Sequence, residues 1–137
     1  MKRYIDTNIF LNSVLYTDEK AAQCINILSK IIERGIIGVT SVLTWDEFIY
    51  VIHKNLGKET AIKESENFFK LPNLLLISAD KNIIVRAQNL MKEYNIKPRD
   101  AIHAATALIN NIHEIISDDA DFDKIKELKR ISPENFR

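Results

Sequence analysis

The 137 residues are enough for one compact domain with a buried core and too few for two. Nineteen Lys and Arg balance nineteen Asp and Glu, so the chain lacks the overall positive charge that would draw it to nucleic acid, and RNA binding would need a local patch and a metal. A lone Cys24 excludes an internal disulfide, no apolar run is long enough to span a membrane, and Asp6 comes too early for a signal peptide. We therefore expect one domain over residues 1–137, cytoplasmic and without a membrane segment.

The first half of the chain is predicted to form two short strands, each followed by helices. Residues 4–5 form the first strand. Apolar residues at helical spacing predict a helix over residues 19–34. A second strand over residues 36–39 is expected to break at residues 40–41, and a helix that ends before Gly57 follows it.

The second half continues the alternation. Residues 58–70 form an amphipathic helix, and residues 74–77 form a continuous apolar strand of the kind that is buried on both faces of a parallel sheet. In chain order there follow helices over residues 80–94 and 98–109, a strand at 115–116, an acidic turn with a short helix through residue 126, and an edge strand at 128–131. This order predicts a three-layer α/β fold with a central, mostly parallel sheet of four or five strands flanked by helices.

Four acidic residues are predicted to converge at the carboxyl ends of the strands, where open α/β sheets bind ligands. Asp6 follows the first strand, and Asp119 lies in the acidic run after the strand at 115–116. Glu47 and Asp100 lie near the beginnings of helices that should face the same rim. Because clustered carboxylates repel one another, Mg²⁺ or Mn²⁺, which prefer oxygen ligands, would remove the conflict. Metal-assisted phosphodiester hydrolysis is the reaction that most needs this arrangement.

Each acidic residue also has a purely structural explanation. Asp6 could cap the next helix, and Asp100 could complement a helix dipole. Glu47 fits a capping box with Thr44. The run around Asp119 could be a solvated turn. These explanations do not account for the placement of all four residues on one rim.

The acidic positions lie in motifs that resemble those of PIN domains. Residues 5–11 look like the opening motif, in which an Asp is followed by Thr or Ser and then by Asn. Residues 99–107 resemble the third motif, an Asp before an alanine-rich helix, and residues 117–122 resemble the fourth. Glu47, within residues 45–48, falls where the second acidic motif is expected. The four motifs occur in order and cover essentially the whole chain.

The resemblance implies a PIN-like fold and, at this length, a VapC-type toxin of a prokaryotic toxin–antitoxin pair. Such toxins are Mg²⁺- or Mn²⁺-dependent endoribonucleases that cut an RNA substrate. They are commonly homodimers, and a small antitoxin protein inhibits them. The resemblance assigns catalytic and metal-binding roles to four residues of this chain, Asp6, Glu47, Asp100 and Asp119.

The resemblance also assigns supporting roles. Asn8 matches the position that orients the first Asp, and Ser117 stands where the fourth motif usually has Thr. The extra acid Asp118 leaves open which aspartate of the run points inward, and we choose Asp119 by the register of the motif, with Asp121 as an outer candidate.

Asp46 and His103 lie beside the acidic positions of the second and third motifs. Asp46, next to Glu47, leaves a similar choice between adjacent acids, since neighbouring helical residues face different directions. His103, one helical turn after Asp100, could reach the edge of the site, and core packing is the favoured alternative.

Three other functions compete with a toxin nuclease. A phosphatase on a similar rim would favour a second aspartate two residues after Asp6, but position 8 is Asn. A non-catalytic PIN-like interaction module would be marked by the loss of acids that this chain retains. A housekeeping RNA-processing nuclease would use the same chemistry, and the gene neighbourhood would distinguish it from a toxin.

Overall fold

The computed structural model describes all 137 residues, and its centre is a single five-stranded sheet. The strands are β1 (Lys2–Ile5), β2 (Ile37–Ser41), β3 (Leu74–Ile77), β4 (Glu114–Ile116) and β5 (Lys129–Ile131). They lie in the order β3-β2-β1-β4-β5, and every neighbouring pair is parallel. The predicted parallel α/β architecture is therefore confirmed, with β1 in the middle of the sheet.

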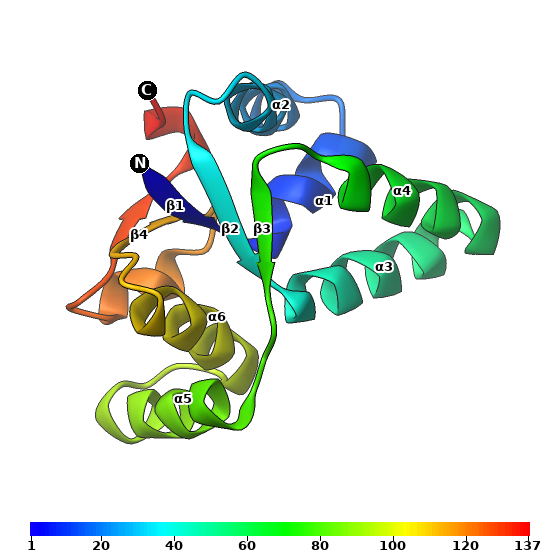
Figure 1. Cartoon of the computed structure of the whole chain (residues 1–137). Coiled ribbons are helices and arrows are strands. Elements are labelled where there is room, and N and C mark those ends of the chain that lie inside the picture. Colours follow the sequence, from blue (N-terminus) through cyan, green and yellow to red (C-terminus); the bar gives the residue numbers. More distant parts are fainter.

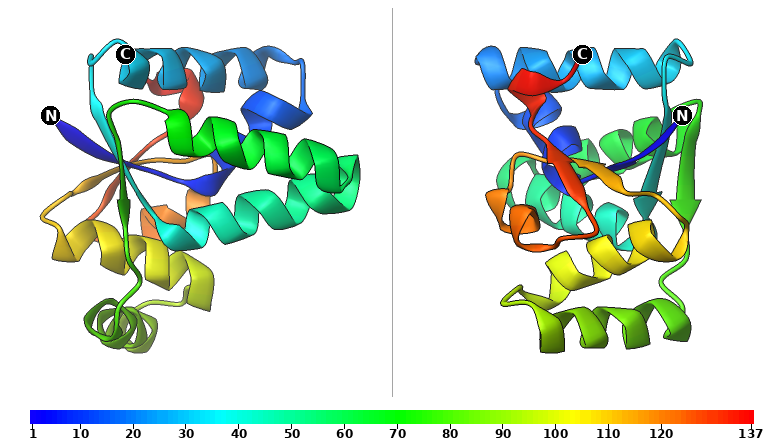
Figure 2. Two further views of the ribbon diagram at one scale, coloured as in Figure 1. Left: turned by 45° about the vertical axis from the view of Figure 1, so that its right-hand side comes forward. Right: turned by 90° about the vertical axis from the view of Figure 1, so that its left-hand side faces the viewer.

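Helices cover both faces of this sheet (Figures 1 and 2). The helices are α1 (Thr7–Leu15), α2 (Glu19–Ile32), α3 (Val42–Leu56), α4 (Lys58–Lys70), α5 (Lys81–Glu93) and α6 (Pro98–Ile109), with short 3₁₀ helices η1 (Ala120–Lys124) and η2 (Pro133–Asn135). Aspartate side chains accept a hydrogen bond from the first turn of three of them, at Asp6, Asp18 and Asp80. None of the helices has both the length and the apolar character that a membrane crossing requires.

The two faces of the sheet form two separate hydrophobic cores. Tyr4 and Ile5 are adjacent on β1 and fully buried, but Tyr4 packs in the core under α5 and α6 while Ile5 packs in the core under α1, α2 and α3. This division follows from the alternation of side chains along a strand. Four buried alanines of α6 let that helix lie close to the sheet, namely Ala101, Ala104, Ala105 and Ala107.

Two details of the predicted strands are wrong. The apolar strand β3 is an edge strand rather than a central one, and its Leu75 and Leu76 are 43% and 36% exposed. Strand β2 does not break at Thr40, because Thr40 and Ser41 pair with β3. Thr40 tolerates burial in the sheet because its hydroxyl donates to the carbonyl of Ile5 at 2.7 Å.

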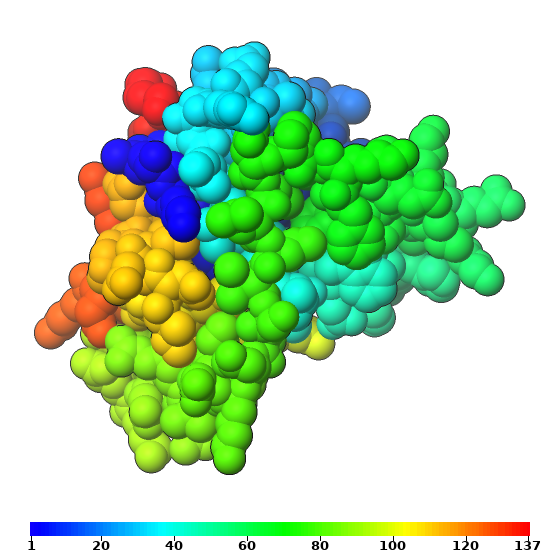
Figure 3. Space-filling model, viewed as in Figure 1, coloured from blue at the N-terminus to red at the C-terminus, as the bar shows by residue number.

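Helices α3 and α4 pack against each other and stand out to one side of the sheet (Figures 1 and 3). Helix α3 begins directly after β2, so its first turns lie at the carboxyl edge of the sheet. The segments that follow β1 and β4 begin at the same edge. This edge brings together the residues described next.

Candidate active site

Asp6 is the first residue after β1 and is nearly buried, with 6% of its surface exposed. One carboxylate oxygen accepts from the backbone N–H of Thr7 at 2.8 Å, so the residue does cap α1. The other oxygen accepts from the Ser117 hydroxyl at 2.6 Å and from the Asn8 amide at 3.2 Å. Burial raises the pKa of Asp6, while nearby His103 and the hydrogen bonds from Ser117 and Thr7 oppose that rise.

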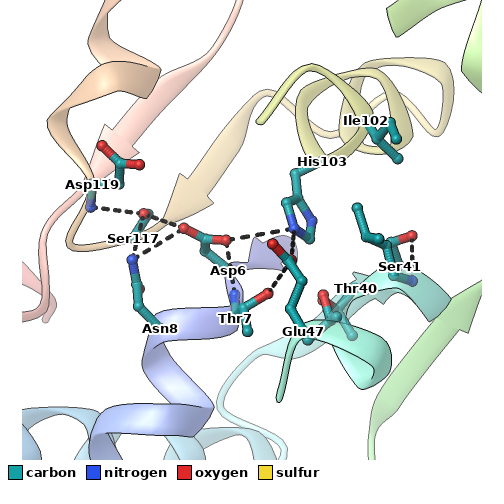
Figure 4. A network of polar contacts seen from close by, with 12 residues as sticks. Asp6, Thr7, Asn8, Thr40, Ser41, Glu47, Ile102, His103, Ser117 and Asp119 are labelled. Carbon is teal, nitrogen blue, oxygen red and sulfur yellow. Dashed lines mark hydrogen bonds and ion pairs between the residues drawn. The ribbon is translucent and has the colours of Figure 1, made fainter. Parts of the chain in front are cut away.

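Asn8 and Ser117 join the start of α1 to the turn after β4 (Figure 4). The Ser117 hydroxyl also accepts from the backbone N–H of Asp119 at 2.9 Å, and the Asn8 side-chain oxygen accepts from the N–H of Asp118 at 3.2 Å. Both residues therefore contact Asp6, which the resemblance had implied for Asn8 alone, and both also accept hydrogen bonds from the backbone of the acidic turn.

The aspartates of that turn point in different directions. Carboxylate oxygens of Asp100, Asp119 and Asp121 lie within 4.8 Å of one another. Asp118 turns away and forms an ion pair with Lys20 at 2.8 Å. Burial, followed by the charges of Asp119 and Asp6, raises the pKa of Asp100 to about 6. The structure thus places both Asp119 and Asp121, and not Asp118, against Asp100.

Glu47 lies in the second turn of α3, not in a capping box with Thr44. The N-cap of α3 is Ser41, whose hydroxyl accepts from the N–H of Leu43 at 3.0 Å, and buried Thr44 is hydrogen-bonded to Thr40. One Glu47 oxygen instead accepts from the Thr7 hydroxyl at 2.8 Å. The capping-box explanation is therefore wrong, because the helix begins before Thr44.

His103 is buried as expected, yet it also contacts the acidic residues. Its Nε2 lies 2.5 Å from the Glu47 carboxylate and 3.9 Å from that of Asp6 (Figure 4). Burial alone would lower the pKa of His103, but the hydrogen bond to Glu47 and the charge of Asp6 raise it above its ordinary value. For Glu47, burial would raise the pKa, and the contact with His103 lowers it. The sequence signal for this contact was the placement of His103 one turn after Asp100.

These side chains line one pocket, which we call the acidic pocket. Its acidic lining residues are Asp6, Asp46, Glu47, Asp100 and Asp119. Arg99 is the single Lys or Arg in the lining, and Tyr50 lies at the pocket with 66% of its surface exposed. Asp46 therefore reaches the pocket beside Glu47. Of these two neighbours, Glu47 is the one whose carboxylate accepts hydrogen bonds.

The donor set of the acidic pocket suits a hard divalent cation. Its carboxylates provide the oxygen ligands that Mg²⁺ and Mn²⁺ prefer. Burial, followed by the charges of Asp119 and Asp6, raises the pKa of half-buried Asp100, and a cation would remove the repulsion among these carboxylates. Asp6, Glu47, Asp100 and Asp119 could all contribute oxygen atoms, with Asp121 beside them.

A parallel α/β sheet with acidic residues gathered beyond its carboxyl edge defines a PIN-like domain. The sequence model of the PIN domain family matches residues 3–128, and the chain belongs to this family. PIN domains are nucleases. Comparison with curated protein sequences finds no match.

Solved structures share the fold over nearly their whole length. A chain of a toxin–antitoxin complex from Klebsiella pneumoniae is 25% identical, with 96% of this chain and 97% of that chain covered and a TM-score of 0.68. A chain of VapBC2 from Rickettsia felis, bound to a promoter DNA fragment, is 18% identical with 96% and 98% covered and a TM-score of 0.77. VapC20 from Mycobacterium tuberculosis, a Sarcin–Ricin loop cleaving toxin, is 12% identical with 90% and 93% covered and a TM-score of 0.73.

Proposed function

We propose that the protein is a divalent-metal-dependent endoribonuclease of the VapC type, the toxin of a toxin–antitoxin pair, with residues 1–137 forming one nuclease domain. The observation that carries the proposal is the acidic pocket, in which carboxylates from four separate segments face one another. Membership of the PIN family and the likeness to toxin–antitoxin structures support it.

Four residues would hold Mg²⁺ or Mn²⁺, namely Asp6, Glu47, Asp100 and Asp119. A divalent metal bound there would polarise an RNA phosphate and lower the pKa of a water molecule. Asn8 and Ser117 keep the Asp6 carboxylate in place through their hydrogen bonds. Asp121 faces Asp100 and would act from the outer side of the cluster.

Arg99 supplies the positive charge that an acidic pocket otherwise lacks. It follows Pro98 in the first turn of α6 and is exposed. A guanidinium in this place would contact a phosphate of the RNA backbone, which positions the strand without reading its sequence. The chain as a whole has no net charge, so this local contact and the metal would provide the attraction for RNA.

Two exposed apolar surfaces are consistent with the binding of protein partners. A groove between α3 and α4 is lined by Trp45, Ile62 and Phe69, and the last two are 50% and 60% exposed, which suits a small antitoxin. Ile84 and Val85 of α5 are 44% and 48% exposed, which would suit a homodimer contact. Light scattering of the purified protein, alone and co-expressed with a small upstream reading frame, would measure both assemblies.

Cleavage of a structured RNA pool tests the nuclease proposal. The purified protein is incubated with Mn²⁺, with Mg²⁺ or with EDTA, beside the variant Asp6→Asn and the variant Asp118→Asn. We expect cutting that needs metal, is lost in Asp6→Asn and persists in Asp118→Asn, because Asp118 points away from the pocket. Cutting that persists in EDTA or in Asp6→Asn would overturn the proposal.

A further inference from the structure

The buried ring of His103 lies between two polar groups that come from different elements. Its Nδ1 is 2.6 Å from the hydroxyl of Tyr4 on β1, and its Nε2 is 2.5 Å from the carboxylate of Glu47 on α3. Only 1% of the His103 surface is exposed. A polar ring that is buried to this extent is normally held by hydrogen bonds at both nitrogens, and here both have a partner.

The Ser41 N–H, which can only donate, and the Glu47 carboxylate, which can only accept, fix the direction of the two outer hydrogen bonds. The backbone N–H of Ser41 donates to the Tyr4 hydroxyl oxygen at 3.1 Å, and the hydroxyl retains one proton and one lone pair. It can therefore donate to Nδ1 of a neutral His103 ring or accept from Nδ1 of a protonated ring. An ionised carboxylate can only accept, so His103 Nε2 must be the protonated nitrogen that faces Glu47. A hydrogen-bond chain therefore links Ser41, Tyr4, His103 and Glu47, and in either protonation state of the ring its last bond is donated by His103 Nε2 to Glu47.

This hydrogen-bond chain begins and ends at the same helix, α3. Ser41 is the N-cap of α3, and Glu47 lies in the second turn of α3. Between them the hydrogen-bond chain passes through Tyr4 of β1 and His103 of α6, and Tyr4 and the alanines of α6 pack in the core that α3 does not share. The hydrogen-bond chain thus ties the start of α3, which projects from the sheet with α4 (Figure 1), to α6, which carries Asp100, and to β1, which Asp6 follows.

Glu47 benefits directly from this arrangement. A free glutamate side chain loses rotamer freedom when it is ordered, and this loss opposes the binding of a ligand. In this protein one oxygen of Glu47 already accepts from His103 and from the Thr7 hydroxyl, and the other is left without a protein donor. The carboxylate is therefore ordered before any ligand arrives, with one oxygen available to the acidic pocket.

We propose that His103 is a positioning residue, which is oriented by Tyr4 and holds the Glu47 carboxylate ready for a divalent cation. The proposal rests on the metal-dependent function proposed above. Groups behind a metal ligand commonly change metal affinity or activity by about 10–100-fold when they are removed. The role differs from core packing, because it depends on a hydroxyl and a ring N–H rather than on volume.

Deletion of the Tyr4 hydroxyl provides the first test. Tyr4→Phe keeps the ring and removes the partner of His103 Nδ1, and Tyr94→Phe is the matched control, since its hydroxyl bonds Glu127 on the exposed surface. We expect Tyr4→Phe to weaken Mn²⁺ binding, measured by calorimetry without RNA, by about tenfold. Tyr94→Phe should leave it unchanged. Equal Mn²⁺ affinity in both variants would overturn the proposal.

Variants of His103 separate the donor from the volume. His103→Gln can still present an N–H to Glu47, whereas His103→Leu cannot, and the first should retain most of the Mn²⁺ affinity that the second loses. Thermal unfolding identifies any variant that fails to fold. If the two folded variants bind Mn²⁺ equally well, a positioning role is excluded.

Nitrogen NMR of the metal-free protein tests the chain independently of cleavage. With ¹⁵N-labelled histidine, we expect His103 Nε2 to be protonated in the wild type and its signals to change in Tyr4→Phe but not in Tyr94→Phe. An unprotonated Nε2 in the wild type would overturn the proposed direction. A wild type that binds Mn²⁺ and cuts RNA while Tyr4→Phe matches it would overturn only this proposal. A wild type that binds no Mn²⁺ would overturn the proposed function as well.

Discussion

The Ser117 hydroxyl donates to the Asp6 carboxylate at 2.6 Å, although the two residues are 111 positions apart in the sequence. Each is the first residue after its strand, Asp6 after β1 and Ser117 after β4. The backbone continues the pairing, because the N–H of Asp6 donates to the carbonyl of Ile116 at 3.1 Å. The central strand pair of the sheet therefore sets the position of the first acid of the pocket.

Removing this hydroxyl should destabilise the protein. In Ser117→Ala, buried Asp6 loses a donor and the N–H of Asp119 loses an acceptor, so the free energy of unfolding should fall by about 1–3 kcal/mol. Urea denaturation measures the change. Ser132→Ala is the matched control, because the buried Ser132 hydroxyl has no hydrogen-bond partner, and its loss should be neutral or slightly stabilising. A Ser117→Ala protein as stable as the control would contradict this reading.

A negative charge introduced at position 8 should also lower the stability of the protein. Asn8→Asp replaces the amide donor to Asp6 and Ser117 with a carboxylate that faces another carboxylate, so the metal-free protein should lose about 1–3 kcal/mol of stability. The same change at exposed Asn55, whose amide bonds only the carbonyl of Val51, should cost about 0.5 kcal/mol or less. Thermal unfolding in EDTA compares the two variants, and equal losses would show that the contact with Asp6 has no special weight.

The fold was largely predictable because the strands and helices have different apolar periods. The limits of α4 and α6 agree with the predicted helices at residues 58–70 and 98–109. The order of strands in the sheet is not written in any local pattern, so the apolar run of β3 was mistaken for a central strand. Thr40 was mistaken for a break because its buried hydroxyl finds its acceptor on β1, 35 residues earlier in the chain.

The candidate site was predictable where a residue stands in a motif and not where it acts through distant partners. Asp6, Asp100 and Asp119 were placed on one rim by their motifs, and the structure brings them to one pocket. For His103 the sequence favours core packing over a place at the edge of the site, because Tyr4 and Glu47, which it contacts, are 99 and 56 residues away in the sequence. Its place one turn after Asp100 indicates that it lies near the site, but no local pattern identifies Tyr4 and Glu47 as its partners.

A divalent cation should stabilise the protein through the acidic pocket. Because a ligand bound only by the folded state stabilises it, Mn²⁺ at about 100 times its dissociation constant should add about 2.7 kcal/mol to the free energy of unfolding. The melting temperature in Mn²⁺ and in EDTA measures this. Asp119→Asn should lose the increase, since Asp119 faces Asp100.

The neighbouring aspartate gives a control that differs by one position. Asp118→Asn removes an exposed ion pair with Lys20, which contributes little to stability, and it should retain the full Mn²⁺ effect. Loss of the effect in Asp118→Asn with retention in Asp119→Asn would mean that the wrong aspartate has been assigned to the pocket. No increase with either Mn²⁺ or Mg²⁺ in the wild type would contradict the metal site itself.

Asp100 should make the metal-free protein less stable as the pH rises. Its pKa in the folded protein is about 6, against an ordinary value of 3.8, so the folded state binds the proton more tightly than the unfolded state. The stabilising contribution of this group is therefore complete below about pH 4 and is lost as the pH rises through about 6. Asp100→Asn stays neutral and escapes this loss. Because Asp100 is only half-buried, solvent screening limits the advantage of the variant at pH 8 to about 1 kcal/mol.

Urea denaturation of the wild type and Asp100→Asn in EDTA, at pH 5 and at pH 8, measures this linkage. The free energy of unfolding of the variant should rise relative to that of the wild type between pH 5 and pH 8, because only the wild type acquires a half-buried charge that faces Asp119 and Asp6. Saturating Mn²⁺ at pH 8 should reverse the order, since the cation stabilises the charged carboxylate and the variant has none to offer. If the two proteins differ in their free energy of unfolding by the same amount at both pH values, ionisation of Asp100 does not destabilise the metal-free protein.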